Sequence, residues 1–314
     1  MKNKNNKRIP FVFILTILLL SCLPTWGQNL GTDIQKLVDW QFSLDSIHWQ
    51  QVTIPHSYNA TDGHSRKYYR GKAYYRRNVV LSESDLRRPL MLLFEGAAQQ
   101  ATIEINGAKV QNHKGGYTPF WINLKGLVRK GENRIEVTCD NHEDVNLIPV
   151  SSDFNKNGGL HNPVWLLKMS PIYFSPTNTG LYRLHVATPH VSDREAQAFM
   201  RADIVNASGS RQQVSVDITL LDKAGKIVYA SQRNLRLPKS AAQPVTIVDS
   251  VTVRQPHLWN GLKDPYLYQA VMTICDKKGH KLDEVKTKIG FRYFQATADK
   301  GFFLKGKTSP LHGV

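Results

Sequence analysis

The sequence predicts an all-β protein built from two consecutive β-sandwich domains. Short runs rich in β-branched and aromatic residues recur along most of the chain, and turns rich in Gly, Asn and Asp separate them. No stretch of a dozen residues has a convincing helical period; the nearest is a weak one over residues 33–44. The length of 314 residues fits two domains after removal of a leader.

Residues 1–27 have the composition of an export signal. A basic start, with Lys2 and Arg8 at its limits, precedes an apolar run over residues 11–20 that is too short to span a bilayer. Ordinary cleavage before Gln28 is the preferred processing. A lipobox ending in Cys22 is the alternative, and it would leave a lipid-modified N-terminus. We therefore predict a periplasmic or secreted protein that meets a membrane only if Cys22 is lipidated.

The basic charge does not predict a nucleic-acid partner. The formal net charge is +16, and removing four basic residues with the leader leaves +12. The Lys and Arg residues are scattered along strand-like stretches, whereas nucleic-acid binding favours a patch or stripe. A solvated surface is the simpler interpretation.

The cysteines predict neither a disulfide framework nor a zinc site. Cys139 and Cys275 both lie in strand-like runs, and two cysteines in a chain of this length are too few for a framework. We expect two buried free thiols. No CxxC or His-rich spacing suggests a metal site.

The first domain is predicted to span residues 28–175 and to be a jelly-roll sandwich. After its third clear strand, Asn106 and Gly107 predict a tight hairpin turn because both tolerate positive φ. Trp49, Trp121 and Trp165, with Trp259 further on, are interpreted first as core aromatics. The expected strands cover residues 73–81, 90–95, 101–105, 134–138 and 164–169.

The second domain is predicted to span residues 176–290 and to be an immunoglobulin-like sandwich. A Pro-rich stretch at residues 171–179 is the expected linker. About seven strand-like runs follow at even spacing, which is typical of this sandwich. They cover residues 181–188, 199–205, 213–221, 226–231, 245–253, 267–275 and 281–289.

Five segments, taken in order, resemble glycoside hydrolase family 2, the β-galactosidase and β-glucuronidase group. They are the WxxVxxPH-like residues 49–56, the strand at 69–77, the FEG–NG–GGYTPF series within 94–120, the loop at 152–166, and the LW–DPYLY pair at 258–268. The resemblance covers almost all of the chain after the leader. It implies a sugar-binding-like first domain and makes residues 291–314 the truncated start of a catalytic (β/α)8 barrel.

The sequence departs from the family pattern at a few positions. Asn162 and Pro163 stand where the galactosidases usually have Arg-Asp, and Lys305 and His312 replace a usual Asn and Arg. The apolar run at residues 302–304 would have no barrel strands to pair with, and exposed edge strands promote association. We therefore expect residues 28–314 to associate.

The resemblance gives Asp153 a role in an intact enzyme. An aspartate at this loop position reaches into the barrel mouth of the family's β-galactosidases, where it contacts sugar hydroxyls and a bound sodium ion. An ionised carboxylate would accept strong hydrogen bonds there. The alternative is a loop aspartate that caps a turn. Asn59 is a weaker candidate for a similar substrate contact, since Asn also favours turns.

The catalytic residues implied by the resemblance lie beyond Val314, so no catalytic residue is predicted within the chain. Retaining glycosidases need two carboxyl groups, and barrel enzymes carry them on strand ends. Glu95, Glu104 and Glu136 are strand residues without evident pairing, and a new dyad would need a raised pKa. A GxSxG nucleophile motif is absent from the sequence.

The predicted function is therefore the N-terminal part of an exported β-glycoside hydrolase, inactive alone. A β-linked glycoside is the expected partner once the barrel is joined, and the chain itself needs no cofactor. A sodium, magnesium or calcium ion is expected only in the intact enzyme. Two alternatives are a stand-alone carbohydrate-binding module and a structural envelope protein. The oligomeric state is not predicted.

Overall fold

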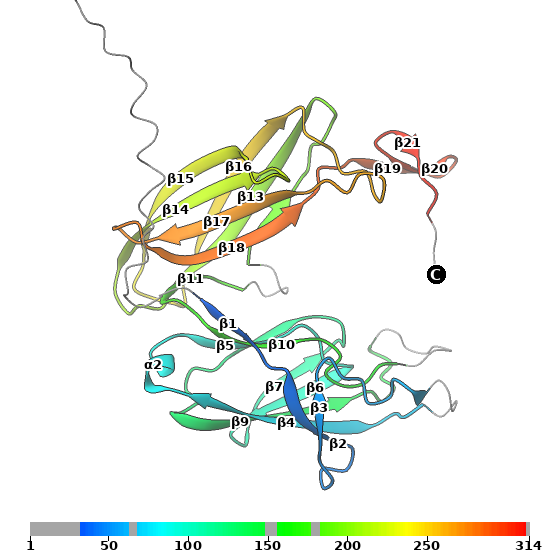
Figure 1. Ribbon diagram of the computed structural model, residues 1–314, viewed down its shortest axis with the longest axis vertical. Coiled ribbons are helices and arrows are strands. Elements are labelled where there is room, and N and C mark those ends of the chain that lie inside the picture. Colours follow the sequence, from blue (N-terminus) through cyan, green and yellow to red (C-terminus); the bar gives the residue numbers. More distant parts are fainter. Residues whose placement is uncertain (1–31, 63–67, 148–155, 177–182, 312–314) are drawn as a thin grey trace, which may run out of the picture.

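The computed structural model describes residues 32–62, 68–147, 156–176 and 183–311. Within these ranges the only helix is the short α2 (Glu83–Leu86), and antiparallel strands form nearly all the remaining regular structure. The all-β prediction is confirmed. Figure 1 shows two sandwiches, one above the other, and a small third sheet beyond the second one.

The first sandwich packs a six-stranded sheet against a four-stranded one. Alternating residues of its strands face a core that contains Trp40, Tyr75 and Phe94. The six-stranded sheet has the order β3 (Gln50–Thr53), β2 (Asp39–Ser43), β4 (Lys72–Leu81), β9 (Gly131–Asp140), β6 (Gln100–Ile105) and β7 (Ala108–Lys114). The other has the order β1 (Asp33–Lys36), β10 (Val164–Lys168), β5 (Leu90–Phe94) and β8 (Phe120–Asn123).

Two local expectations in this domain have opposite outcomes. The weak helical period over residues 33–44 is wrong, because this stretch forms β1 and β2 in different sheets, with Leu37 buried between them. Pairing of these strands with β10 and β4 satisfies the backbone and overrides the local period. The turn at Asn106 and Gly107 is confirmed, with φ values of 52° and 81°.

The second sandwich also has two sheets. In one, β13 (Glu195–Asn206) pairs with β16 (Val245–Arg254), β12 (His185–Ala187) and β11 (Ile172–Phe174). The other has the order β15 (Ile227–Leu237), β14 (Gln212–Leu221), β17 (Tyr268–Cys275) and β18 (Lys281–Ile289). Asp249 joins β16 to the facing β15, because its buried carboxylate accepts hydrogen bonds from Tyr229, Ser231 and Arg233.

Part of the predicted linker belongs to the second sandwich. Residues 172–174 form β11 and pair with residues 204–206 of β13. All three side chains are buried, so the apolar Ile-Tyr-Phe run outweighs the neighbouring Pro residues. The chain therefore passes from β10 to β11 with only residues 169–171 between the domains.

A small apolar cluster joins the two sandwiches. Met91, Leu93 and Leu167 lie on the outer face of the four-stranded sheet and pack with Tyr173 and Val205 of the second domain. This contact explains why every residue of β5 is buried, since both of its faces are covered. Figure 1 places β5, β10 and β11 at this junction.

The last strands form a separate three-stranded sheet. It consists of β19 (Phe294–Thr297), β20 (Gly301–Leu304) and β21 (Lys307–Thr308). This sheet stands beyond the end of the second sandwich (Figure 1), and the contacts of its strands are mainly with one another. Phe294 is 63% exposed on it.

The cysteine prediction is confirmed, because Cys139 and Cys275 are both buried and free. The tryptophan prediction is wrong in detail. Trp49, Trp121, Trp165 and Trp259 are only half-buried, and the fully buried tryptophan is Trp40. Within the described ranges, no helix is long and apolar enough to cross a membrane.

Candidate functional site

The candidate site is the part of the first domain from which residues 148–155 arise. Asp153, the main predicted site residue, lies outside the described residues, and its substrate contact stays a prediction. The described residues on the C-terminal side, from Lys156 onward, return to the sandwich through buried polar contacts. These contacts fix the backbone that follows residues 148–155.

Asn59 lies at the centre of these contacts. Its side chain is fully buried, its Nδ2 donates to the carbonyl of Lys156 at 2.8 Å, and its Oδ1 accepts from the N–H of Gly158 at 2.9 Å. The hydroxyl of Ser57 also donates to this Oδ1 at 3.0 Å. Asn59 therefore holds the backbone of residues 156–158, and its role as a sugar contact stays a prediction.

The carbonyl of Lys156 accepts two further hydrogen bonds. Asn141 donates to it through Nδ2 at 3.2 Å and Arg70 through Nη1 at 3.3 Å. Lys156 itself is only 2% exposed. Asn141 also fixes the backbone of Gly71, whose N–H donates to Asn141 Oδ1 at 2.8 Å. No local pattern predicts the role of Asn141, because its hydrogen-bond partners Gly71, Tyr69 and Lys156 are distant along the chain.

Gly158 and Gly159 allow the returning chain to lie close to two tyrosines. A Cβ on Gly158 would come within 2.1 Å of the Tyr58 ring, and one on Gly159 within 2.4 Å of the Tyr75 hydroxyl. Gly159 also has a φ of +114°, a conformation that favours glycine. The Gly-Gly pair in the resemblance is thus required by close packing.

Behind these glycines lies a cluster of ring side chains that stays neutral. Nδ1 of His56 lies 2.8 Å from the Tyr75 hydroxyl, and the Tyr58 hydroxyl donates to the carbonyl of Gly71 at 3.1 Å. Burial lowers the pKa of His56 and raises the pKa values of Tyr58 and Tyr75 well above the usual range. The cluster therefore supports the backbone and is poorly suited to transfer protons.

Two buried polar groups were missed by the sequence interpretation. Nε2 of Gln99 and Nε2 of His161 are both buried without a hydrogen-bond partner in the described structure. Gly159 forms a β-bridge with Ala98, the residue before Gln99, which brings the two segments together. Tyr117, 59% exposed, has its ring 5.2 Å from that of His161. In the sequence, only the neighbouring motif glycines Gly158 and Gly159 pointed to this part of the domain.

The acidic residues considered for catalysis do not form a catalytic pair. Glu95 accepts a hydrogen bond from Trp165 Nε1 at 2.7 Å. The statement that Glu104 and Glu136 lack pairing is wrong, because they lie opposite each other on β6 and β9. Glu136 is neutralised by Arg134, with Nη2 and Oε1 3.0 Å apart. The charge of Glu136 is thus balanced by an arginine, and Glu104 and Glu136 do not form a pair of free carboxylates.

The carboxyl groups with a shifted pKa also lack the raised value of a catalytic acid. Where a carboxyl pKa is shifted in the described residues, it is lowered, as for Asp45, Asp85, Asp144, Asp276 and Glu284. Nor do the described residues contain a cluster of three or more His, Cys, Asp or Glu side chains fit to hold a metal ion.

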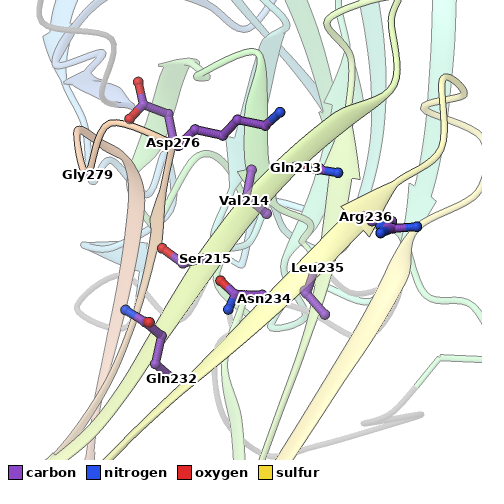
Figure 2. Close-up of a pocket in the computed structure, with 10 residues that line it drawn as sticks. Gln213, Val214, Ser215, Gln232, Asn234, Leu235, Arg236, Asp276 and Gly279 are labelled. Carbon is purple, nitrogen blue, oxygen red and sulfur yellow. The ribbon is translucent and has the colours of Figure 1, made fainter.

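A surface pocket lies on the second domain. Figure 2 shows it on the outer face of β14 and β15 beside the turn that carries Asp276, with a volume of about 650 Å³. Four of its ten lining residues are uncharged and polar, and three are charged, namely Arg236, Asp276 and Lys277. Burial opposes ionisation of Asp276, but hydrogen bonds from His280 still lower its pKa. This pocket therefore offers no acid–base pair.

Two family models match the chain. The description "Glycosyl hydrolases family 2, sugar binding domain" matches residues 35–171, and "Glycosyl hydrolases family 2" matches residues 180–292. The two matches fall on the first and second sandwich.

Similar proteins support the same assignment. A β-glucuronidase of Bacteroides fragilis is 31% identical over 84% of this chain and 38% of its own length. The β-galactosidase BoGH2A of Bacteroides ovatus is 26% identical over 92% and 33%, respectively. The crystal structure of a Bacteroides uniformis β-glucuronidase aligns with a TM-score of 0.82 at 29% identity, over 90% of this chain and 35% of that one. The chain spans about a third of the length of these relatives.

Proposed function

This chain belongs to family 2 of the glycosyl hydrolases, and we propose that it is the N-terminal region of an enzyme that hydrolyses terminal β-glycosides. The observation that carries the proposal is the order of the two family domains on two successive sandwiches. The names of the relatives point to a β-glucuronide or a β-galactoside as the substrate.

In this proposal the first domain presents the loop at residues 148–155 to the substrate. Asp153 accepts hydrogen bonds from sugar hydroxyls as an ionised carboxylate, and in the intact enzyme it contacts a bound sodium ion. The support is the set of buried hydrogen bonds directly after these residues, in which Asn59 and Asn141 fix the carbonyl of Lys156. A loop that starts from a fixed backbone can hold its carboxylate at a defined place.

We further propose that the chain alone does not hydrolyse glycosides. A retaining glycosidase needs two carboxyl groups about 5–5.5 Å apart, one of them with a raised pKa. The one facing pair in the described strands, Glu104 and Glu136, has an arginine on one member. The lack of a suitable carboxyl pair in the described strands favours a catalytic pair supplied by a separate barrel.

Genome sequence and an activity assay test these proposals together. Past codon 314, in any of the three frames, we expect an Asn-Arg-His-like continuation and a barrel with two glutamates on strand ends. The purified chain should leave aryl β-galactosides and β-glucuronides intact. Turnover by a preparation freed of host enzymes would overturn the proposed inactivity, and a downstream region without barrel glutamates would overturn the proposed enzyme.

Export of the protein is also proposed, on the leader composition alone. Mass spectrometry of the protein from its native host should show an N-terminus at Gln28, or a lipid-modified Cys22 if the lipobox is used. A cytoplasmic protein that retains Met1 would contradict export.

A further inference from the structure

A second candidate site lies on the six-stranded sheet of the first domain, where the neighbouring strands β2 and β4 separate. β2 and β4 pair only between residues 41–43 and 74–76. Beyond Arg76, β4 continues to Leu81 with β9 as its neighbour. A cleft of about 460 Å³ opens between the strands, within the size range of ligand pockets. It is lined by Asp39, Trp40, Gln41, Gln51, Arg76, Arg77, Asn78 and Arg134.

The cleft is positively charged. Three arginines line it against one acidic residue, Asp39. Arg134 is paired to Glu136 at its edge, but Arg76 and Arg77 form no ion pair with any carboxylate of the described residues. Arg76 nevertheless lies opposite Glu136 across β4 and β9, so Asp39 and Glu136 together leave the three arginines a local excess of one positive charge.

Of the three arginines, Arg77 is the one with a buried N–H group that lacks a hydrogen-bond partner in the described structure. Its Nη1 donates to the carbonyl of Asp39 at 2.6 Å, while its Nε is buried and has no partner in the described structure. Burial lowers its pKa, and the Asp39 carboxylate opposes this shift without forming an ion pair. Partial burial of a cation without a counter-ion is unfavourable, and a bound oxyanion would relieve it.

Arg76 is held in a fixed orientation. Its guanidinium carbon lies 3.8 Å from the centre of the Trp49 ring, and its Nε donates to Gln41 Oε1 at 2.6 Å. The stacked ring and the amide fix the plane of the guanidinium, which leaves its outer N–H groups as a prepared fork. A planar fork of this kind matches the two oxygens of a carboxylate or sulfate.

We propose that this cleft binds the anionic group, a carboxylate or a sulfate ester, of an acidic oligosaccharide. The amide side chains of Gln41, Gln51 and Asn78 can hydrogen-bond sugar hydroxyls beside the arginines. Phosphate sites commonly use backbone N–H groups at turns or helix N-termini, whereas this cleft is lined by strand side chains. The proposal is independent of hydrolysis, since it uses no catalytic carboxyl group.

Titration calorimetry of the purified chain tests the proposal. The probes are an oligogalacturonate, a sulfated oligosaccharide without uronate, and a neutral galactan oligosaccharide. We expect binding of one or both acidic probes, weakened by added salt, and much weaker binding of the neutral one. Binding of only one acidic probe identifies the anionic group. Binding of neither, or equal binding of the neutral probe, overturns the proposal.

Variants locate the binding in the cleft. Arg77→Gln should weaken binding about tenfold or more, and the exposed Arg134→Gln by several-fold, because each removes a charged donor. Arg77→Lys keeps the charge but loses the fork, and it should also weaken binding. Arg211→Gln, an exposed arginine of the second domain with the same charge change, should stay within about twofold of wild type.

The other variants keep the test decisive if one variant fails to fold. If Arg77→Gln does not fold, the Arg134→Gln and Arg77→Lys titrations decide the outcome. Unchanged affinity in both of these variants would overturn the site. Equal affinity of the chain for polyglutamate would show a general anion surface and would overturn the assignment to a sugar.

Discussion

At the scale of single residues, the difference between a surface asparagine and a buried one is decided by partners that lie far apart in the sequence. Asn59 and Asn141 are both fully buried and share the carbonyl of Lys156. Each satisfies a backbone group that would otherwise be buried without a partner, which is unfavourable by about 1–3 kcal/mol. The two side chains thus stabilise the fold at Lys156, directly after residues 148–155.

Replacing Asn59 should therefore be costly. Asn59→Ala removes the partners of the Gly158 N–H and of the Ser57 hydroxyl, and we expect a loss of about 2–3 kcal/mol in unfolding free energy. Urea denaturation measures it. Asn112→Ala on the exposed β7, where the side chain bonds only to Thr102, should cost less than about 1 kcal/mol. Equal effects of the two variants would contradict the buried role of Asn59.

Acid stability should depend on Asp85. Burial alone would raise its pKa, but Lys168, 2.7 Å away, and hydrogen bonds from Ser82 lower it from 3.8 to about 2. A carboxyl group with a depressed folded-state pKa stabilises the protein above its unfolded pKa, and this contribution is lost as the pH falls towards the folded value. Asp85→Asn and Lys168→Met should each flatten the loss of stability between about pH 4 and pH 2.

Urea denaturation across that pH range checks the expectation. The double variant should show no further flattening, because both changes remove the same ion pair. Stability curves of Asp85→Asn that run parallel to wild type would show that the pair does not act in this range.

At the scale of elements, the small sheet at the end of the described chain is the one that lacks a packing partner. β19 pairs with β20 alone among the described strands, and Phe294 and Phe302 stack on each other with ring centres 5.8 Å apart. An edge strand with an exposed apolar residue favours pairing with another chain. The sequence analysis expected the apolar run at residues 302–304 to lack pairing partners, but these residues lie in the central strand β20, and the exposed aromatic residue is Phe294 on β19.

Association of the chain should follow from this sheet. Sedimentation velocity of residues 28–314 should show concentration-dependent association, and Phe294→Lys should reduce it by placing a charge on the edge strand. Leu262→Lys is the control, since this fully exposed leucine lies in a turn. A monodisperse wild-type monomer that melts cooperatively would contradict the prediction.

At the scale of the whole molecule, a compact apolar contact joins the sandwiches. Tyr173 and Val205 of the second domain pack on Met91, Leu93 and Leu167 of the first. A buried network adds to it: the Asp283 carboxylate accepts from the Phe174 N–H at 2.9 Å and from Arg183 at 2.8 Å. Asp283 also accepts from Thr32, which lies just before β1 of the first domain. The two domains are thus held by apolar and polar contacts together.

Loss of the tyrosine should uncouple the domains. Tyr173→Ala removes a buried aromatic side chain from the junction, and we expect a loss of about 3 kcal/mol and two separated transitions in calorimetry. Phe199→Ala, on the exposed outer face of the adjacent β13, should leave the transition single and cost less. A single transition for Tyr173→Ala with unchanged midpoint would show that the junction is not what couples the sandwiches.

The sequence by itself determined the all-β class, the positions of most strands, the Asn106 turn, the buried thiols and the family, because strands, turns and motifs are written in local patterns. Only the tertiary structure decided that residues 172–174 join the second sheet, that Trp40 rather than Trp49 lies in the core, and that Asn59 holds the backbone at Lys156. The cleft lined by arginines between β2 and β4 was also visible only in the tertiary structure. The physical reason is that burial and hydrogen-bond satisfaction depend on neighbours brought from distant parts of the chain, which a local pattern does not encode.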